Sequence, residues 1–138
     1  MQCAVNVMNS IGAIGYISKD PNPNRILKEC QDKEIPILAI RAVQAGALTS
    51  KMDREPHPSG RDKPDFDDYE RAESFRDLAK EWGESPASLA HRYALSIQKV
   101  SSVILGVKNT KELQECIEAE SKDNLNEVQL KELESLFA

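Results

Sequence analysis

The chain has 138 residues, of which 40% are hydrophobic and 30% are charged. These values are typical of a folded, soluble domain rather than a disordered chain, and a chain of this length can bury about two-thirds of the surface that its unfolded state exposes. The formal net charge of -5 argues against a general nucleic-acid or membrane-surface binder, because both need a surplus of Lys and Arg to meet phosphates. Any site for an anion must therefore be local.

The sequence shows neither a membrane-spanning nor a secretory pattern. Its longest apolar stretch, residues 35–42, is interrupted by Arg41 and is much too short to cross a bilayer. The N-terminus has no basic segment before an apolar one and no cleavage-site pattern. We therefore expect a cytoplasmic protein that does not bind membranes.

The cysteines and histidines show no metal-binding or disulfide pattern. Cys3, Cys30 and Cys116 are odd in number and widely separated, which favours reduced thiols. His57 and His91 lack the spacing of metal ligands. His91 lies beside the apolar face of a predicted helix, where a structural role is favoured over that of a catalytic base. No metal site is predicted.

A strand, a helix and a second strand are predicted in the first third of the chain. Residues 3–8 are short, apolar and followed by turn-forming residues, as expected for a buried strand. Asn22 and Pro23 supply an N-cap and a first-turn proline for a helix that ends near Lys33. Residues 35–40 are apolar on both faces, which is typical of a central parallel strand covered by helices. Together they predict a βαβ unit.

The middle of the chain is predicted to form a long loop, two helices and a third strand. Residues 44–64 combine Gly, Pro and mixed charges, which is typical of a functional loop. A helix over 67–82 carries an apolar face and ends at Gly83. A second helix begins at Ser85, and the β-branched run at 103–105 predicts a third strand.

The next predicted helix begins at Asn109 or Thr110, either of which can cap it. This helix is expected to carry Leu113, Cys116 and Ile117 toward a core.

A last helix begins with a capping-box pair, Asn126 and Gln129. The order of elements predicts one α/β domain over residues 1–138, with about three parallel strands. The expected apolar face of the last helix consists of Val128, Leu130, Leu133, Leu136 and Phe137.

The segment between the third strand and the following helix is a candidate phosphate site. It contains Gly106, Lys108, Asn109 and Thr110, so free backbone N–H groups and the positive end of a helix dipole meet a lysine. An ordinary capped loop with a solvated lysine has the same pattern, and this segment alone favours that structural interpretation.

A second candidate site lies where the second strand ends. Arg41 and Gln44 follow this buried strand, and the C-terminal ends of parallel strands are where α/β folds bind ligands. A single Arg can instead pair with a neighbouring carboxylate. Two polar loops at one end of the same sheet favour a binding site.

Residues 78–89 resemble a helix-turn-helix, with glycine in the turn and a Ser-capped second helix. The candidate recognition helix, however, offers only His91 and Arg92 as cations, whereas duplex binders need several phosphate contacts. We therefore interpret this segment as a corner between two helices and expect no nucleic-acid partner.

Three segments resemble, in order and spacing, the C-terminal part of aldo-keto reductases: IRAVQAGALT at 40–49, ESPASLAHRYAL at 84–95 and VILGVKN at 103–109. The resemblance covers nearly the whole chain, from the family's sixth barrel strand onward. It implies a partial (β/α)8 TIM barrel, because a complete barrel takes about 250 residues and eight strands. Whole members of the family reduce aldehydes and ketones by hydride transfer from NADP(H), with a Tyr as proton donor.

The same resemblance implies an NADP(H) site but no catalytic residue in this chain. The family's catalytic Tyr, Asp, Lys and His lie in the first half of the barrel, which this chain does not contain. The residues implied for the cofactor are Gln2 at the nicotinamide carboxamide; Arg41, Val43 and Gln44 beside the pyrophosphate; Gly106, Lys108, Asn109 and Thr110 around the 2'-phosphate; and Glu112 and Glu115 near the adenine.

Three positions depart from the family's usual residues. Ile40 stands where an aromatic ring commonly stacks on the nicotinamide, and Ile has no π-face. Glu112 stands where Gln or Arg is usual, and Cys116 stands where Asn is usual. These departures predict altered cofactor binding.

A sheet of about three parallel strands has open edges, which promote aggregation unless they are paired or covered. We expect self-association, pairing with a missing barrel half, or rearrangement. The implied function is NADP(H)-dependent reduction of a small carbonyl substrate, with this chain inactive alone. Two alternatives stay open: a non-catalytic nucleotide-binding or assembly module and, less favoured, a helix-turn-helix DNA binder.

Overall fold

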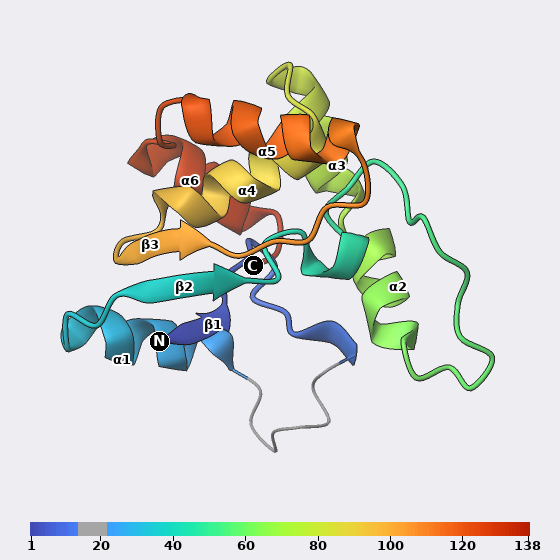
Figure 1. Cartoon of the computed structure of the whole chain (residues 1–138), viewed down its shortest axis with the longest axis horizontal. Helices are drawn as coiled ribbons and strands as arrows, with labels where there is room; N and C mark the ends of the chain where they lie inside the picture. Colours follow the sequence, from blue (N-terminus) through green and yellow to red (C-terminus); the bar gives the residue numbers. More distant parts are fainter. Residues whose placement is uncertain (14–21) are drawn as a thin grey trace.

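The computed structural model describes residues 1–13 and 22–138. Figure 1 shows the strands beside one another with helices packed around them. The elements in chain order are β1 (Gln2–Ala4), α1 (Pro23–Asp32), β2 (Ile37–Ile40), the short 3-10 helix η2 (Gln44–Gly46), α2 (Lys63–Arg71), α3 (Glu73–Glu81), α4 (Pro86–Ser96), β3 (Val100–Val103), α5 (Thr110–Ser121) and α6 (Glu127–Ser135).

The strands form one parallel sheet in the order β1-β2-β3, which confirms the α/β architecture expected from the sequence. Ala39 pairs with Cys3 on one side and Val103 on the other. The strands are short because β2 ends before Arg41, whose φ of 57 turns the backbone away from the extended region. The predicted strand over 3–8 is therefore reduced to β1, with one further bond from Val5 N to Ile40 O at 3.0 Å.

The third strand begins and ends earlier than the sequence predicts. β3 covers Val100–Val103 rather than 103–105. Ile104 N still donates to Ala39 O at 2.8 Å, and there the pairing with β2 ends. Ile104 and Leu105 are 47% and 39% exposed, so their apolar character does not mark a buried strand. β-branched residues form a strand only where a neighbouring strand continues beside them.

The predicted helix over 67–82 consists of two helices, α2 and α3, which meet at Ala72 (φ -88, ψ 15). α2 begins at Lys63, inside the predicted loop. The boundary moved because Pro64 is compatible with the first turn of a helix and does not mark a loop there.

Helix ends are set by the residues that the sequence indicates. Gly83 has φ 70 and follows α3, where backbone bonds to Lys80 O and from Glu84 N to Ala79 O form the Schellman arrangement. The remaining caps are Asn22 for α1, Ser85 for α4, Asn109 for α5, and the Asn126 and Gln129 capping box for α6.

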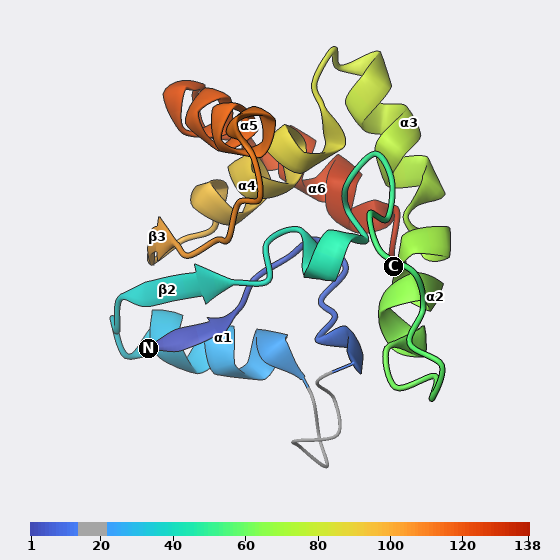
Figure 2. The same cartoon turned by 45° about the vertical axis from the view of Figure 1, so that its right-hand side comes forward.

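Two apolar clusters hold the helices to the sheet. The smaller one joins the strands to α1 and α4 through residues that include Cys3, Cys30, Ile37, Ala39 and Ala94. Figure 2 shows α1 below the strands and α4, α5 and α6 above them. The larger cluster joins the chain after η2 to α3, α4 and α6, and its fully buried side chains include Leu48, Phe75, Leu89 and Leu133.

Several apolar residues that were expected to face a core are exposed. Leu113 and Ile117 on α5 are 45% and 51% exposed, and Val128 on α6 is 73% exposed. α5 packs on α4 through another face, where Ala119 is buried and Cys116 is half-buried. The helical spacing of these residues is correct, but no described element covers this side of α5.

One face of the sheet is open. Gln2, Leu38 and Ser102 pair across the three strands, and all three are exposed. Ile37 and Ala39, which flank Leu38 and point the other way, are fully buried against the helices. Within the described residues, the outer edges of β1 and β3 pair with no further strand. These residues therefore do not form a closed barrel.

Candidate functional site

The two candidate loops lie beyond the C-terminal ends of β2 and β3 (Figure 1). η2 follows β2, α2 packs against η2, and the loop before α5 follows β3. Loops and helix N-termini converge at this end of a parallel sheet, which makes it the usual place for a ligand in α/β folds.

Arg41 and Gln44 lie at this end of β2, as predicted, on an unusual backbone. The φ angles of Arg41, Gln44 and Ala45 are 57, 46 and 53, all in the left-handed region. A residue with a Cβ in this region costs roughly 1–2 kcal/mol, so surrounding contacts must hold the turn. Val43 is half-buried against the larger apolar cluster and therefore contributes packing to this loop.

Asp65 of α2 holds the Arg41 side chain. Arg41 Nη2 lies 2.9 Å from Asp65 Oδ1, and Arg54 Nη2 lies 3.1 Å from Asp65 Oδ2. Ala13 N also donates to Asp65 Oδ1, at 2.9 Å. Because the Asp65 side chain is only 7% exposed, its carboxylate is buried between two guanidinium groups. It joins the chain after β1, the end of β2 and the loop before α2.

Gln44 is fully buried, and its amide is saturated with hydrogen bonds. Its Nε2 donates to Asp68 Oδ2 at 2.9 Å and to Ser10 Oγ at 3.1 Å. Its Oε1 accepts from Arg41 Nε at 3.0 Å and from Asn6 Nδ2 at 3.4 Å. Ser10 Oγ also donates to Asp68 Oδ2 at 2.5 Å. Gln44 is thus a structural junction whose side chain has no hydrogen-bonding capacity left for a ligand.

Gly12 allows the chain after β1 to approach this network. Its φ is 50, and a Cβ there would lie 2.0 Å from Asp65 Oδ1 and 2.5 Å from Gln44 Nε2. Real side chains cannot occupy that space, so glycine is required here.

The loop before α5 keeps the features of a phosphate site. Asn109 is the N-cap of α5, and its Oδ1 accepts from Glu112 N at 3.0 Å. A Glu112 carboxylate oxygen accepts from Lys108 N at 2.7 Å. The backbone N–H groups of Thr110 and Lys111 have no partner among the described residues. The positive end of the α5 dipole is therefore open to an anion.

The Lys108 ammonium forms an ion pair with Asp53, in the loop between η2 and α2. The hydrogen bond from Lys108 is the main cause that lowers the pKa of Asp53, so Asp53 is charged at neutral pH. The next residue, Arg54, contacts Asp65 and donates to Ala45 O at 2.7 Å. Two consecutive loop residues thus connect the two candidate loops.

The other implied residues are more widely spread. Glu115 is half-buried on α5, one turn after Glu112. Gly106 is exposed, with no atom within 4 Å of the position of a Cβ, so packing does not require a glycine there. Gln2 begins β1 and lies at the opposite end of the strand from the candidate loops. Asn6 is the polar side chain that follows β1 at the candidate end.

The sequence did not identify Asn6, Ser10, Asp65 and Asp68 as members of this network. Asn6 fell inside the predicted strand over 3–8, and carboxylates at the start of a helix are usually solvated. The spacing of Asp65 and Asp68 could have indicated that both carboxylates point to the same side of α2, because residues three apart share one face of a helix.

His91 and Cys116 form a separate contact between α4 and α5. His91 Nε2 lies 3.4 Å from Cys116 Sγ, and His91 is 6% exposed. Burial lowers the pKa of His91, while burial, Glu115 and Glu112 raise the pKa of Cys116. Both side chains are therefore neutral at pH 7, which supports a structural role for His91 and supplies no thiolate nucleophile.

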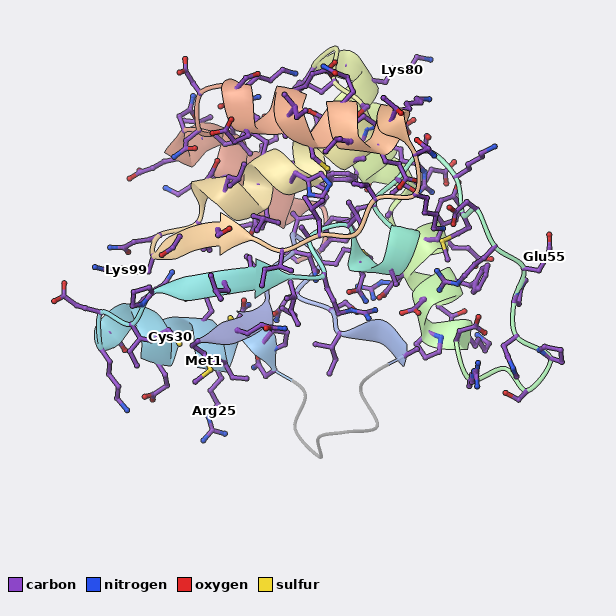
Figure 3. The ribbon with its side chains drawn as sticks, in the orientation of Figure 1. Met1, Arg25, Cys30, Glu55, Lys80 and Lys99 are labelled. Atoms are coloured by element: carbon purple, nitrogen blue, oxygen red, sulfur yellow. The ribbon has the colours of Figure 1, made fainter. Side chains whose placement is uncertain are left out.

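Among the described residues, no group of three or more His, Cys, Asp or Glu side chains is placed to hold a metal ion. None of the described helices has the length and apolar character that a membrane span needs. A cavity of about 350 Å³ lies beside α1, where Figure 3 shows Met1 and Cys30, and none of the candidate residues lines it.

The model of the aldo/keto reductase family matches residues 4–138. The chain belongs to this family. A comparison with curated proteins gives no match.

Two solved structures share the fold. One is the thermostable aldo-keto reductase Tm1743 in complex with the inhibitor epalrestat, at a TM-score of 0.62 and 18% identity; the match covers 98% of this chain and 38% of that one. The other is the glycerol dehydrogenase AKR11B4 from Gluconobacter oxydans, at a TM-score of 0.69 and 20% identity, covering 98% and 41%. This chain spans about two-fifths of their length, which confirms the partial-barrel architecture.

Proposed function

We propose that this chain supplies the phosphate-binding side of an NADP(H) site in an aldo-keto reductase barrel whose catalytic groups come from outside residues 1–138. One observation carries the proposal: Lys108 and the open N-terminus of α5 follow β3 at the end of the sheet where parallel α/β folds bind ligands. In the whole barrel, NADP(H) would supply the hydride and a small aldehyde or ketone would accept it.

The loop before α5 suits the 2'-phosphate of NADP(H). A phosphate accepts hydrogen bonds from backbone N–H groups and is stabilised by the positive end of a helix dipole, and Thr110 and Lys111 offer both. Lys108 adds a full positive charge at the same helix end. Its side chain is 65% exposed and can turn toward a ligand.

Lys108 favours a phosphorylated cofactor over one that carries a hydroxyl group. Because the carboxylate of Asp53 already pairs with Lys108, a ligand must offer a stronger acceptor to displace that carboxylate. A phosphate dianion does so, whereas the 2'-hydroxyl of NAD(H) does not. The site should therefore prefer NADP(H) to NAD(H).

The end of β2 is less suited to direct binding than its sequence implies. Gln44 is saturated by its neighbours, and Arg41 already bonds to Asp65 and Gln44. Arg41 Nη1 has no partner among the described residues, so this atom is the one that could meet a pyrophosphate oxygen. Gln44 supports the loop rather than the ligand.

The described tyrosines support a catalytic acid from elsewhere. Tyr93 OH donates to Glu134 at 3.0 Å, and burial together with Glu134 raises the Tyr93 pKa far above its ordinary value. Tyr69 OH donates to Ser50 O at 3.1 Å and is held by that bond. Neither hydroxyl is placed to protonate a carbonyl at the sheet end.

The test is a titration of the purified chain with NADPH and with NADH, followed by cofactor fluorescence. Lys108→Ala should weaken NADPH binding at least about tenfold and leave NADH binding nearly unchanged. Lys131→Ala is the matched control, because Lys131 is an exposed lysine on α6, outside the candidate site, with no side-chain partner among the described residues. Equal losses in both lysine variants, or no preference for NADPH, would contradict the proposal.

A non-catalytic nucleotide-binding module is the second candidate. It is favoured by the lack of a catalytic set among the described residues and predicts the same NADPH binding. The two candidates differ in activity: a barrel completed by its missing half would reduce carbonyl compounds, whereas a binding module would not. A cytoplasmic location remains a prediction.

A further inference from the structure

A polar cavity of about 390 Å³ lies between the end of α3 and α6, and no residue of the candidate cofactor site lines it. This size is within the range of small-molecule pockets, which is roughly 300–1,000 Å³. The lining residues are Trp82, Glu84, Arg92, Gln129 and Glu132.

A buried ion pair lines the cavity. Glu84 and Arg92 pair directly, and their side chains are 6% and 13% exposed. Arg92 Nε also donates to Asp123 O at 2.7 Å, and Lys122 Nζ lies 3.3 Å from Glu84 Oε2. These contacts fix the orientation of both charged side chains before a ligand binds. Ligand binding therefore does not have to order these side chains further.

The fixed groups keep unused hydrogen-bonding capacity of both kinds. Arg92 Nη2 has no acceptor among the described residues, and Glu84 Oε2 accepts no hydrogen bond despite its ion pair with Lys122. The carboxylate of Glu132, on α6, has no cationic partner within the described part of the chain. Glu84 Oε2 is itself buried beneath Lys122, so the cavity offers one donor group, on Arg92, and one acceptor group, on Glu132.

The indole ring of Trp82 also lines the cavity. Trp82 is half-buried at the end of α3. An aromatic ring binds apolar or aromatic groups and also attracts cations that lie over its face. A ligand with one apolar group can therefore use the ring while its charged groups meet the ion pair.

The geometry points to a binding site for a small amino carboxylate with an apolar side chain, separate from the cofactor site. Its carboxylate meets Arg92 Nη2, its ammonium meets Glu132, and its side chain lies on Trp82. A zwitterion fits better than a simple cation, because Arg92 and Lys122 already neutralise Glu84 and would repel a second positive charge. A zwitterion also fits better than a simple anion, because the Glu132 carboxylate would repel an anion that carries no positive charge. This inference does not depend on NADP(H) binding.

Trp82 makes the site directly measurable, since it is the only tryptophan in the sequence. The experiment titrates the full chain with L-phenylalanine and follows Trp82 emission, excited where phenylalanine does not absorb. Phenethylamine, which lacks the carboxylate, and N-acetyl-L-phenylalanine, which lacks the ammonium, are the matched probes. We expect saturable binding of L-phenylalanine below about 10 mM, with both probes at least about fivefold weaker.

Glu132→Gln should weaken L-phenylalanine binding about fivefold, while Glu127→Gln, an exposed change on the same helix, should have no effect. Both variants keep the buried ion pair and should fold normally. No saturable change in Trp82 emission would overturn the proposal. Equal binding of phenethylamine and L-phenylalanine would overturn the zwitterion assignment, as would a Glu132→Gln variant that binds like the unchanged chain.

Discussion

Asp53 and Lys108, 55 residues apart in the sequence, form an ion pair that joins the loop before α2 to the loop before α5. The pair is largely solvated, with side chains 42% and 65% exposed, so it contributes little to stability. The pair matters because it places the Asp53 carboxylate against Lys108, the lysine that we assign to the 2'-phosphate.

Asp53→Asn should therefore strengthen NADPH binding by about threefold, because Lys108 no longer has to leave a charged partner. The gain should shrink as salt is added, since both groups are exposed. Glu55→Gln is the control: it lies in the same loop, and Figure 3 shows Glu55 pointing outward. Titration with NADPH at two salt concentrations measures the effect. Weaker binding in Asp53→Asn would mean that the ion pair holds the loop over the cofactor instead of competing with it.

Asp65 should be far more important for stability than its neighbours in α2. Asp65→Asn leaves the largely buried Arg41 guanidinium, and the more exposed Arg54, without their shared carboxylate, and breaking a buried pair costs about 3–5 kcal/mol. Asp67→Asn removes only an exposed pair with Lys63 and should cost less than about 0.5 kcal/mol. Urea unfolding of both variants compares the two losses. Similar losses would show that Asp65 is not the centre of the network.

The contrast between Asp65 and Asp67 also shows where sequence patterns reach their limit. Alternation and helical spacing located the strands and the α-helical regions, because those patterns depend on local burial, but they merged α2 and α3 into one helix and placed β3 too late in the chain. The same patterns could not distinguish a carboxylate bound by two arginines from a solvated one two residues later. That difference arises from how α2 docks on the end of β2, a contact between segments far apart in the sequence.

The candidate at β1 shows a similar limit. The sequence resemblance implies Gln2 for the nicotinamide, and that role stays a prediction. Gln2 begins β1, and the polar side chain beside Arg41 and Gln44 is that of Asn6, which the sequence pattern did not single out. Strand length decides which residue reaches the ligand end, and β1 ends at Ala4 because β2 ends at Ile40. Strand ends are set by pairing with the neighbour, which a single segment does not reveal.

His91 should make the protein less stable as the pH falls. Burial lowers its pKa in the folded state below the ordinary value of 6.5, so the unfolded state binds a proton first on acidification. The His91 contribution to the free energy of unfolding should therefore be retained above its ordinary pKa of 6.5 and be lost as the pH falls below that value. Urea unfolding above and below that pH should show a smaller decline for His91→Gln than for the unchanged chain. An equal decline would assign the pH dependence to other groups.

Leu113 and Ile117 should promote self-association of the isolated chain. They lie one turn apart on the uncovered side of α5, Ile104 and Leu105 before this helix are also exposed, and β3 has an unpaired outer edge among the described residues. Exposed apolar patches next to an open strand edge favour contact with another chain. In size-exclusion chromatography with light scattering, the unchanged chain should form oligomers, and the double variant Leu113→Lys and Ile117→Lys should shift toward the monomer. Val128→Lys, which changes an even more exposed apolar residue on α6, should leave the oligomers intact. A monomeric unchanged chain would instead mean that the open edge and the α5 stripe are too small to associate without the rest of the barrel.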